Sequence, residues 1–170
     1  MNKIESERLI FKSYKKDEIE NFRSLVTNKI IMKYVGNGVL SQEKAKELWN
    51  KLIEDFYPQG VNTIWSVFAK ADSRYIGHAA IRPRTTKKED WEISYMLRKE
   101  DWGKGLATEI AKRLIEYGFK ELDLPEIFAT VDDENLASHK VLEKSGMNFK
   151  EFEYDDDGRF SVFSIIKNLA

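Results

Sequence analysis

The chain has 170 residues, a length that predicts one domain with a sizeable hydrophobic core. Hydrophobic residues make up 42% and charged residues 34% of the chain, which is typical of a globular protein and excludes a disordered one. The 28 basic residues nearly balance the 29 acidic ones, which excludes bulk attraction to nucleic acid or an anionic membrane, and the lack of cysteine excludes disulfides, thiolate metal sites and cysteine nucleophiles.

The first half of the chain is predicted to contain one strand, two helices and three further strands. Apolar residues recur at spacings of three and four in both helical segments, and Ser41 is placed to cap the second helix. In chain order, these elements are a strand over 8–13, helices over 16–26 and 41–57, and strands over 63–70, 75–82 and 91–98. The polar run 84–90 is predicted to be a solvated hairpin loop.

The second half is predicted to add two helices and three strands. In chain order, these are a helix over 104–122, a strand over 127–131, a helix over 135–144, and strands over 147–154 and 160–167. The strand–helix–strand unit over 91–131 implies one right-handed parallel crossover, whereas the other strands follow each other as antiparallel hairpins. We therefore predict an α/β fold with a mixed, mostly antiparallel seven-stranded sheet.

The sequence gives little support for a metal site or a hydrolytic triad. Two histidines, His78 and His139, are too few for a site built mainly on imidazole, and no G-x-S-x-G motif is present. We expect His78 to be a packed or edge residue of a strand and His139 to be an ordinary helix residue. The run 155–158 lacks the glycine and glutamate of a calcium-binding loop and predicts a hairpin turn.

Targeting signals are not evident in the chain. No apolar run approaches the ~18 residues of a membrane span, and the opening MNKIESERLIF lacks the apolar region of a signal peptide. We therefore expect a cytoplasmic protein with neither a membrane nor a nucleic-acid partner, present as a monomer or a homodimer.

The segment 91–108, WEISYMLRKEDWGKGLAT, carries the clearest functional signal. A predicted strand leads into a loop in which Gly103 and Gly105 precede a helix. A helix N-terminus presents free N–H groups and the positive end of the helix dipole, and the glycines allow a ligand to approach the backbone. This pattern indicates an anion site for a phosphate or pyrophosphate, but neither the P-loop nor the G-x-G-x-x-G motif is complete.

The same segment resembles motif A of the GNAT acetyltransferase superfamily, Q/R-x-x-G-x-G/A, with Trp102 in the first position. Its fuller string is similar to the Rim-type branch, the relatives of ribosomal-protein N-terminal alanine acetyltransferases, in which tryptophan is common there. A second matching motif runs from Glu134-Asn135 through Ser138 to Gly146-Met147, and Glu7-Arg8-Leu9 is similar to the branch's opening. The resemblance covers 5–168, so we expect one N-acetyltransferase domain over 1–170, with helices on both faces of the sheet.

The resemblance implies acetyl-CoA as cosubstrate and no metal. The pyrophosphate would bind the N–H groups of the glycine loop, and the pantetheine arm would lie beside a strand that separates from its neighbour, with the Leu97 N–H polarising the thioester carbonyl. Asn135 would bind the pantetheine arm, although helix N-capping is an equally ordinary role for it. The cofactor-binding residues implied in this way are Met96, Leu97, Trp102, Gly103, Lys104, Gly105, Leu106, Ala107, Thr108, Asn135 and Ser138.

The catalytic residues that we predict are Ser138, Glu92 and Asn135. Many family members carry an acidic tyrosine seven residues after the asparagine, but this chain has Leu142 there, and Ser138 is the position assigned in Rim-type relatives. Ser138 could also be a plain helix residue. Glu92 alternates with Tyr95 on the strand and is a candidate base acting through water, or a partner of a cation; Tyr95 is expected to be a core residue.

The sequence favours an acetyl-CoA-dependent N-acetyltransferase that transfers directly to a primary amine. Two alternatives are a non-catalytic acetyl-CoA sensor of the same fold and an unrelated NAD or ATP binder. The acceptor stays open between a protein N-terminus, a polyamine, an aminoglycoside and an amino acid. Residues 28–60 and 153–160 would bind it, and their aromatic and acidic side chains would suit a cation; these are Tyr34, Trp49, Glu54, Asp55, Phe56, Tyr57 and the turn 155–157.

Overall fold

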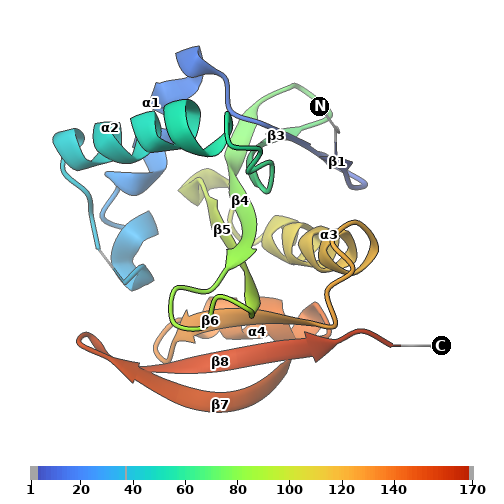
Figure 1. Ribbon diagram of the computed structural model, residues 1–170. Helices are drawn as coiled ribbons and strands as arrows, with labels where there is room; N and C mark the ends of the chain where they lie inside the picture. Colours follow the sequence, from blue (N-terminus) through green and yellow to red (C-terminus); the bar gives the residue numbers. More distant parts are fainter. Residues whose placement is uncertain (1–3, 37, 169–170) are drawn as a thin grey trace.

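The computed structural model (Figure 1) describes residues 4–36 and 38–168. Its strands are β1 (Ile4–Glu5), β2 (Leu9–Lys12), β3 (Ile64–Ala69), β4 (Tyr75–Pro83), β5 (Trp91–Leu97), β6 (Glu126–Asp132), β7 (Asn148–Asp155) and β8 (Gly158–Ile166). Its α-helices are α1 (Ile19–Val26), α2 (Gln42–Asn50), α3 (Leu106–Lys120) and α4 (Leu136–Lys144). Short 3-10 helices are η1 (Lys16–Glu18), η2 (Ile31–Tyr34) and η4 (Lys99–Asp101), and a π-helical turn, η3 (Lys51–Phe56), follows α2.

The strands form one mixed sheet in the order β1-β2-β3-β4-β5-β6-β8-β7. Only the β5–β6 pair is parallel among the strands described, and α3 connects its two strands, so the predicted crossover is confirmed. The sheet has eight strands rather than seven because Ile4 and Glu5 pair with the residues after the first turn, Ile4 opposite Phe11. A two-residue strand has too little alternation to be recognised from sequence.

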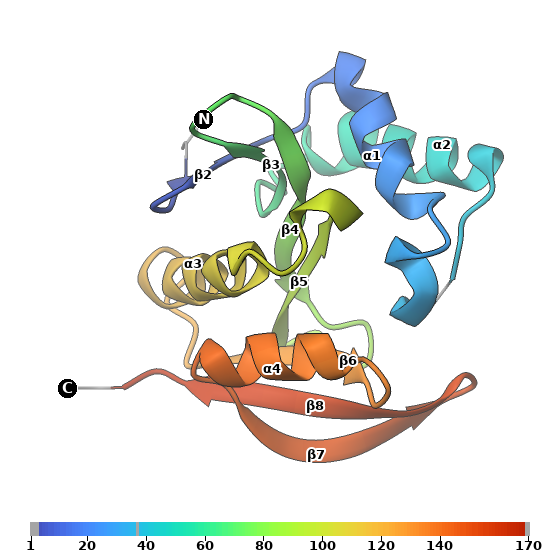
Figure 2. The same ribbon diagram turned by 180° about the vertical axis from the view of Figure 1, so that it is seen from behind.

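Helices cover both faces of the sheet, as Figures 1 and 2 show from opposite sides. On one face, α3 and α4 pack over the central strands in a buried cluster that includes Ile110, Leu114 and Leu142. On the other face, α1 and α2 form a second cluster with Phe22, Trp49 and their neighbours. Two separate cores therefore lie on one sheet, with α3 over β4, β5 and β6 and α4 against β6 on one side, and with α1 against β4 and α2 against α1 on the other.

Two helix boundaries differ from the prediction. The predicted helix over 41–57 ends as α2 at Asn50 and continues as the π-helical turn; within α2, Trp49 is buried while Leu48 is 38% exposed. The predicted helix over 104–122 begins at Leu106, because Gly103 and Gly105 adopt φ values of +71° and +75° that a right-handed helix excludes. Ser41 caps α2 as predicted, accepting a hydrogen bond from the Lys44 amide at 3.1 Å.

The segment 84–90 is not the fully solvated loop that its polarity predicts. Arg84 is only 3% exposed: its Nη2 donates to Glu153 Oε2 at 2.8 Å, its Nε lies 3.7 Å from Glu92 Oε2, and its guanidinium stacks on Phe128. A buried arginine requires carboxylates around it. Because these partners come from β5, β6 and β7, no local pattern in the sequence indicates that Arg84 is buried.

Candidate active site

The parallel strands β5 and β6 separate soon after they meet. They pair only at Trp91–Ile127 and Glu92–Phe128, although each strand has seven residues. The Arg98 amide donates to the Ile76 carbonyl at 3.0 Å, so the alternation of an antiparallel ladder directs the Leu97 peptide groups away from β4, into the gap. The Leu97 carbonyl accordingly accepts from Trp102 Nε1 at 3.1 Å. The gap therefore presents a free strand edge at its open end.

A turn with left-handed glycines leads from β5 to α3 beside this gap. Gly103 and Gly105 both have positive φ, and Gly105 is the N-cap of α3. The first amides of a 15-residue helix, from Leu106 to Thr108, have no partner within the helix and point along the dipole. This turn fits an anion such as a pyrophosphate, because it presents free amides, and its two positive φ values would be strained for L side chains.

An ion pair between Arg74 and the buried carboxylate of Asp101 lies next to the glycine turn. Asp101 is 1% exposed and accepts two hydrogen bonds from Arg74, both 2.8 Å, while Lys104 Nζ lies 3.3 Å away. The hydrogen bonds from Arg74 lower the pKa of the Asp101 carboxyl despite its burial. Sequence reasoning missed Arg74 and Asp101, since nothing in a turn after β3 indicates a partner 27 residues later.

A second ion pair ties the start of α3 to the N-terminal strands. Glu109 accepts from Ser6 Oγ at 2.6 Å and from the Arg8 amide and Nε, both at 2.7 Å, and Arg8 Nη1 donates to the Lys104 carbonyl. Burial would raise the pKa of Glu109, but the hydrogen bonds from Ser6 and Arg8 outweigh it and lower the pKa. This contact gives Arg8 of the Glu-Arg-Leu opening a structural role beside the glycine turn.

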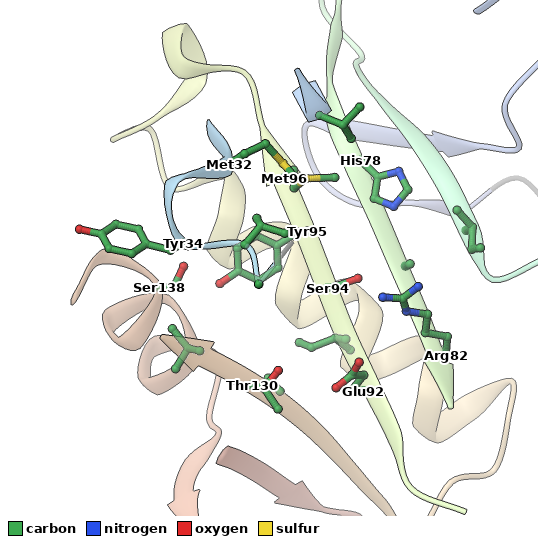
Figure 3. A pocket seen from close by; sticks show the side chains of 18 of the residues that line it. Met32, Tyr34, His78, Arg82, Glu92, Ser94, Tyr95, Met96, Thr130 and Ser138 are labelled. Atoms are coloured by element: carbon green, nitrogen blue, oxygen red, sulfur yellow. The ribbon is translucent and has the colours of Figure 1, made fainter. Parts of the chain in front are cut away.

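Asn135 and Ser138 lie across the gap, at the start of α4. Asn135 Oδ1 accepts from the Ser138 amide at 3.2 Å, so the N-capping role is observed, and its Nδ2 donates to Ser138 Oγ at 3.0 Å. The Tyr95 hydroxyl points toward the Ser138 side chain, as Figure 3 shows. Burial raises the pKa of Tyr95 to about 12, so the phenol stays protonated. Tyr95 is therefore more than the core residue that the sequence predicts.

A cleft of about 550 Å³ is lined by residues from both sides of the gap between β5 and β6. Its floor is formed by β4 and β5, with His78, Arg82, Glu92 and Met96 side by side (Figure 3), and one wall is formed by β6 and α4. The opposite wall comes from α1, η2, α2 and η3. Clefts of this size hold small ligands.

The polar groups of the floor lie at cross-strand positions. Arg82 pairs opposite Glu92, and His78 opposite Met96. Burial raises the pKa of the Glu92 carboxyl above its usual range, although Arg82 and Arg84 act against the rise. Glu92 therefore lines the cleft and lies beside a cation, a position compatible with either predicted role, base or cation partner.

His78 is more involved than a packed histidine. Its Nδ1 lies 3.0 Å from the Tyr14 hydroxyl, which in turn lies 2.9 Å from the Tyr75 hydroxyl, and its ring stacks on Tyr14. Burial, with a smaller effect of Arg82, lowers the pKa of His78 to about 4, so the imidazole is neutral at pH 7. His139 is the ordinary helix residue that was predicted, packing its ring edge-on against Phe163.

Several predicted residues lie apart from the cleft. Trp49 is core, and the acidic residues Glu54 and Asp55 and the turn 155–157 are not among the described residues that line the cleft. Tyr34 and Phe56 do line it. Within the described residues, no three His, Asp or Glu side chains gather as a metal site, and no helix is long and apolar enough to span a membrane.

Comparison with known proteins decides the family. The family model described as "Acetyltransferase (GNAT) domain" matches residues 8–148, most of the chain. This protein belongs to the GNAT acetyltransferase family. It is accordingly an acyltransferase whose acetyl donor is acetyl-CoA.

Individual relatives agree with this assignment. The uncharacterized N-acetyltransferase YnaD of Bacillus subtilis is 29% identical over 149 residues, covering 88% of this chain and 84% of YnaD. A GNAT-family acetyltransferase structure from Bacillus anthracis has a TM-score of 0.82 at 24% identity, covering 97% of this chain and 98% of that one. The structure of RimL, a ribosomal L7/L12 alpha-N-protein acetyltransferase in complex with coenzyme A, has a TM-score of 0.76 at 18% identity, covering 97% and 98%. These structures show the shared fold.

Proposed function

We propose that the protein transfers an acetyl group directly from acetyl-CoA to a primary amine. The observation that carries the proposal is the free edge of β5, which runs from the cleft to the glycine turn at the N-terminus of α3. An extended pantetheine arm fits that edge as an added strand, and its pyrophosphate fits the amides of the turn. Met96, Leu97, Trp102 and the residues from Gly103 to Thr108 are the proposed cofactor contacts on this side, and Asn135 and Ser138 those on the other.

The Leu97 amide is the proposed donor to the thioester oxygen. It belongs to a strand held on its other edge by β4, so its position is fixed before the reaction begins. A preorganised donor of this kind stabilises the negative charge that develops on the oxygen during attack, typically by about 3–4 kcal/mol.

Ser138 is the proposed hydrogen-bond donor to the leaving sulfur. A serine hydroxyl has two acceptor positions and one hydrogen. Asn135 Nδ2 donates to the oxygen at 3.0 Å, and the Tyr95 hydroxyl points toward the same side chain. When both groups donate, the Ser138 hydrogen remains available to the sulfur. Tyr95 on β5 then provides a phenol, which is absent at Leu142, the position where many relatives carry a tyrosine. Water then supplies the proton that converts the departing thiolate into a thiol.

Glu92 is the proposed base that removes a proton from the amine through water. An alkyl ammonium has a pKa near ~10, so the acceptor arrives mostly protonated and must lose a proton before it can attack. The raised pKa of Glu92 brings its basicity closer to neutral pH, and Arg82 and Arg84 keep it ionised there. The N–C bond then forms as the C–S bond breaks, and the amine's second proton leaves to solvent.

The test is turnover together with cofactor binding. Thiol release from acetyl-CoA with a panel of primary amines, confirmed by the mass of the acetylated product, is expected to identify acceptors. Calorimetry is expected to show acetyl-CoA binding without amine. Binding without turnover of any amine would contradict the proposal and favour an acetyl-CoA sensor, whereas tight binding of NAD or ATP in place of acetyl-CoA would contradict the cofactor site.

A further inference from the structure

The wall of the cleft opposite α4 is apolar. It is contributed by α1, η2, α2 and η3 and includes Phe22, Met32, Leu48, Leu52 and Phe56. Among the described residues that this wall gives to the cleft, none is charged, and Tyr34 is the one with a hydroxyl. An apolar ligand body gains by burial here, at about 25 cal/mol per Å² of area removed from water.

The charges of the cleft suit one cation and oppose a second. Three charged side chains line its described part: Arg82, Glu92 and Asp132, which leaves a net charge of −1. Asp132 belongs to the β6 wall, where its Oδ1 already accepts from the Glu134 amide at 2.8 Å. Glu92 is thus the carboxylate of the floor, and Arg82 lies directly opposite it on β4. A second ammonium group would find a further carboxylate only at Asp132 on the β6 wall; elsewhere in the described part of the cleft it would meet the guanidinium or apolar side chains, where a buried unpaired charge is costly.

His78 adds no charge to this balance. Its imidazole is neutral at pH 7, and its Nδ1 is taken by the Tyr14 hydroxyl. A peptide acceptor would need partners for its amide and carbonyl groups, and Tyr34 alone offers a side-chain hydroxyl on the apolar wall.

From these observations we infer that the acceptor is a small monoamine with an apolar, aromatic or aliphatic body, rather than a polyamine, an aminoglycoside or a peptide N-terminus. The inference rests on the proposed function and adds its substrate class. The amine lies toward Glu92 on the floor, and the apolar body lies against the wall formed by α1, α2 and η3. Part of the 550 Å³ must also hold the pantetheine arm, which leaves room for a small acceptor only.

The experiment compares kcat/KM for 2-phenylethylamine, spermidine and an alanine-terminated tripeptide with the full chain and saturating acetyl-CoA. We expect 2-phenylethylamine to exceed both others at least tenfold. Leu48→Glu puts a carboxylate on the apolar wall at a side chain that is 38% exposed, and it should lower the ratio of 2-phenylethylamine to spermidine at least tenfold. Ile30→Glu is the matched control, because Ile30 is also an exposed apolar residue but does not line the cleft.

The outcomes separate the inference from the proposed function. A preference for spermidine or the peptide would overturn the inference while acetyl transfer to amines stands, and so would equal ratios in the Leu48→Glu and Ile30→Glu variants. If no amine is acetylated, calorimetry of the CoA-saturated protein with 2-phenylethylamine and spermidine decides. Tighter binding of 2-phenylethylamine would then support the inference and overturn the proposed function, whereas tighter binding of spermidine, or no binding of either, would overturn the inference.

Discussion

Gly77 lies on β4 directly opposite Leu97, which belongs to the proposed cofactor edge of β5. A Cβ atom on Gly77 would overlap the Met96 carbonyl oxygen and would lie 3.0 Å from Leu97 Cα. Both atoms belong to backbone, so neither can rotate away, and Gly77→Ala must displace β5 from β4 at Met96 and Leu97. The same displacement would move the Leu97 amide.

The expected cost of Gly77→Ala follows from this overlap. Overpacking of this kind typically costs ~1–3 kcal/mol, and restriction of the unfolded chain by alanine returns ~0.4–1 kcal/mol. A protein of this size loses ~2–4 °C in Tm for each kcal/mol, so a fall of several degrees is expected in a calorimetric scan. Because the cofactor edge moves, the Kd for acetyl-CoA should rise at least tenfold, ~1.4 kcal/mol.

Gly118→Ala is the control for Gly77→Ala. A Cβ on Gly118 would meet the side-chain methyl groups of Ile127 and Ile81 at 2.5 and 2.8 Å, in the core beneath α3. Those methyl groups can adjust, and alanine favours the helix by ~1 kcal/mol, so stability changes little and the Kd for acetyl-CoA should not change. Unaltered acetyl-CoA affinity in a Gly77→Ala variant with lowered Tm would refute the placement of the cofactor along Met96 and Leu97.

Four further substitutions test the proposed site. Gly105→Val places a β-branched residue at a φ of +75°, so acetyl-CoA affinity measured by calorimetry should fall at least tenfold; unchanged affinity would remove the glycine turn from the site. Glu92→Gln should lower kcat/KM and abolish the acidic limb of its pH profile. In the wild type this limb should lie above the usual pKa range of a glutamate, because burial raises the pKa of Glu92. A wild-type pH profile in the variant would make Glu92 a structural residue. Ser138→Ala should lower kcat at least tenfold, with a smaller change in KM for acetyl-CoA. Tyr95→Phe should cause part of the same loss in kcat. Full activity of Ser138→Ala would mean that water alone assists the departure of the thiolate.

The parts of the fold that could be predicted are those encoded by local patterns. Alternation and the turn residues locate strands such as β4 and β5, and the Gly-Lys-Gly turn marks the start of α3, because these signals come from residues adjacent in sequence. Alternation also places Glu92 on the floor of the cleft, opposite the α3 side on which Tyr95 packs.

The features that could not be predicted depend on partners distant in sequence. Arg84 is buried because Glu92 and Glu153 converge on it, and Asp101 is buried because Arg74 reaches it from another turn. Tyr95 lies on the expected face, but the separation of β6 leaves its hydroxyl free to reach Ser138. Each of these charges or hydroxyls is, in sequence alone, indistinguishable from a solvated side chain, since only the assembled sheet determines which partner is near.

The neutral state of His78 links stability to the cleft and can be measured. Burial holds the pKa of His78 at about 4 in the folded protein, whereas an unfolded histidine has a pKa of ~6.5, so the unfolded chain binds the proton first. The free energy of unfolding should therefore fall as the pH decreases from ~6.5 toward about 4, by ~2 kcal/mol between pH 7.5 and pH 5. His78→Gln keeps a polar group beside Tyr14 but cannot be protonated, so urea unfolding of the variant should lose ~2 kcal/mol less than the wild type over this interval. Comparing the two proteins removes the contributions of the carboxylates, which both retain. Equal losses would mean that the imidazole is protonated in the folded state near pH 6, and the cleft would then carry a cation that repels an amine acceptor.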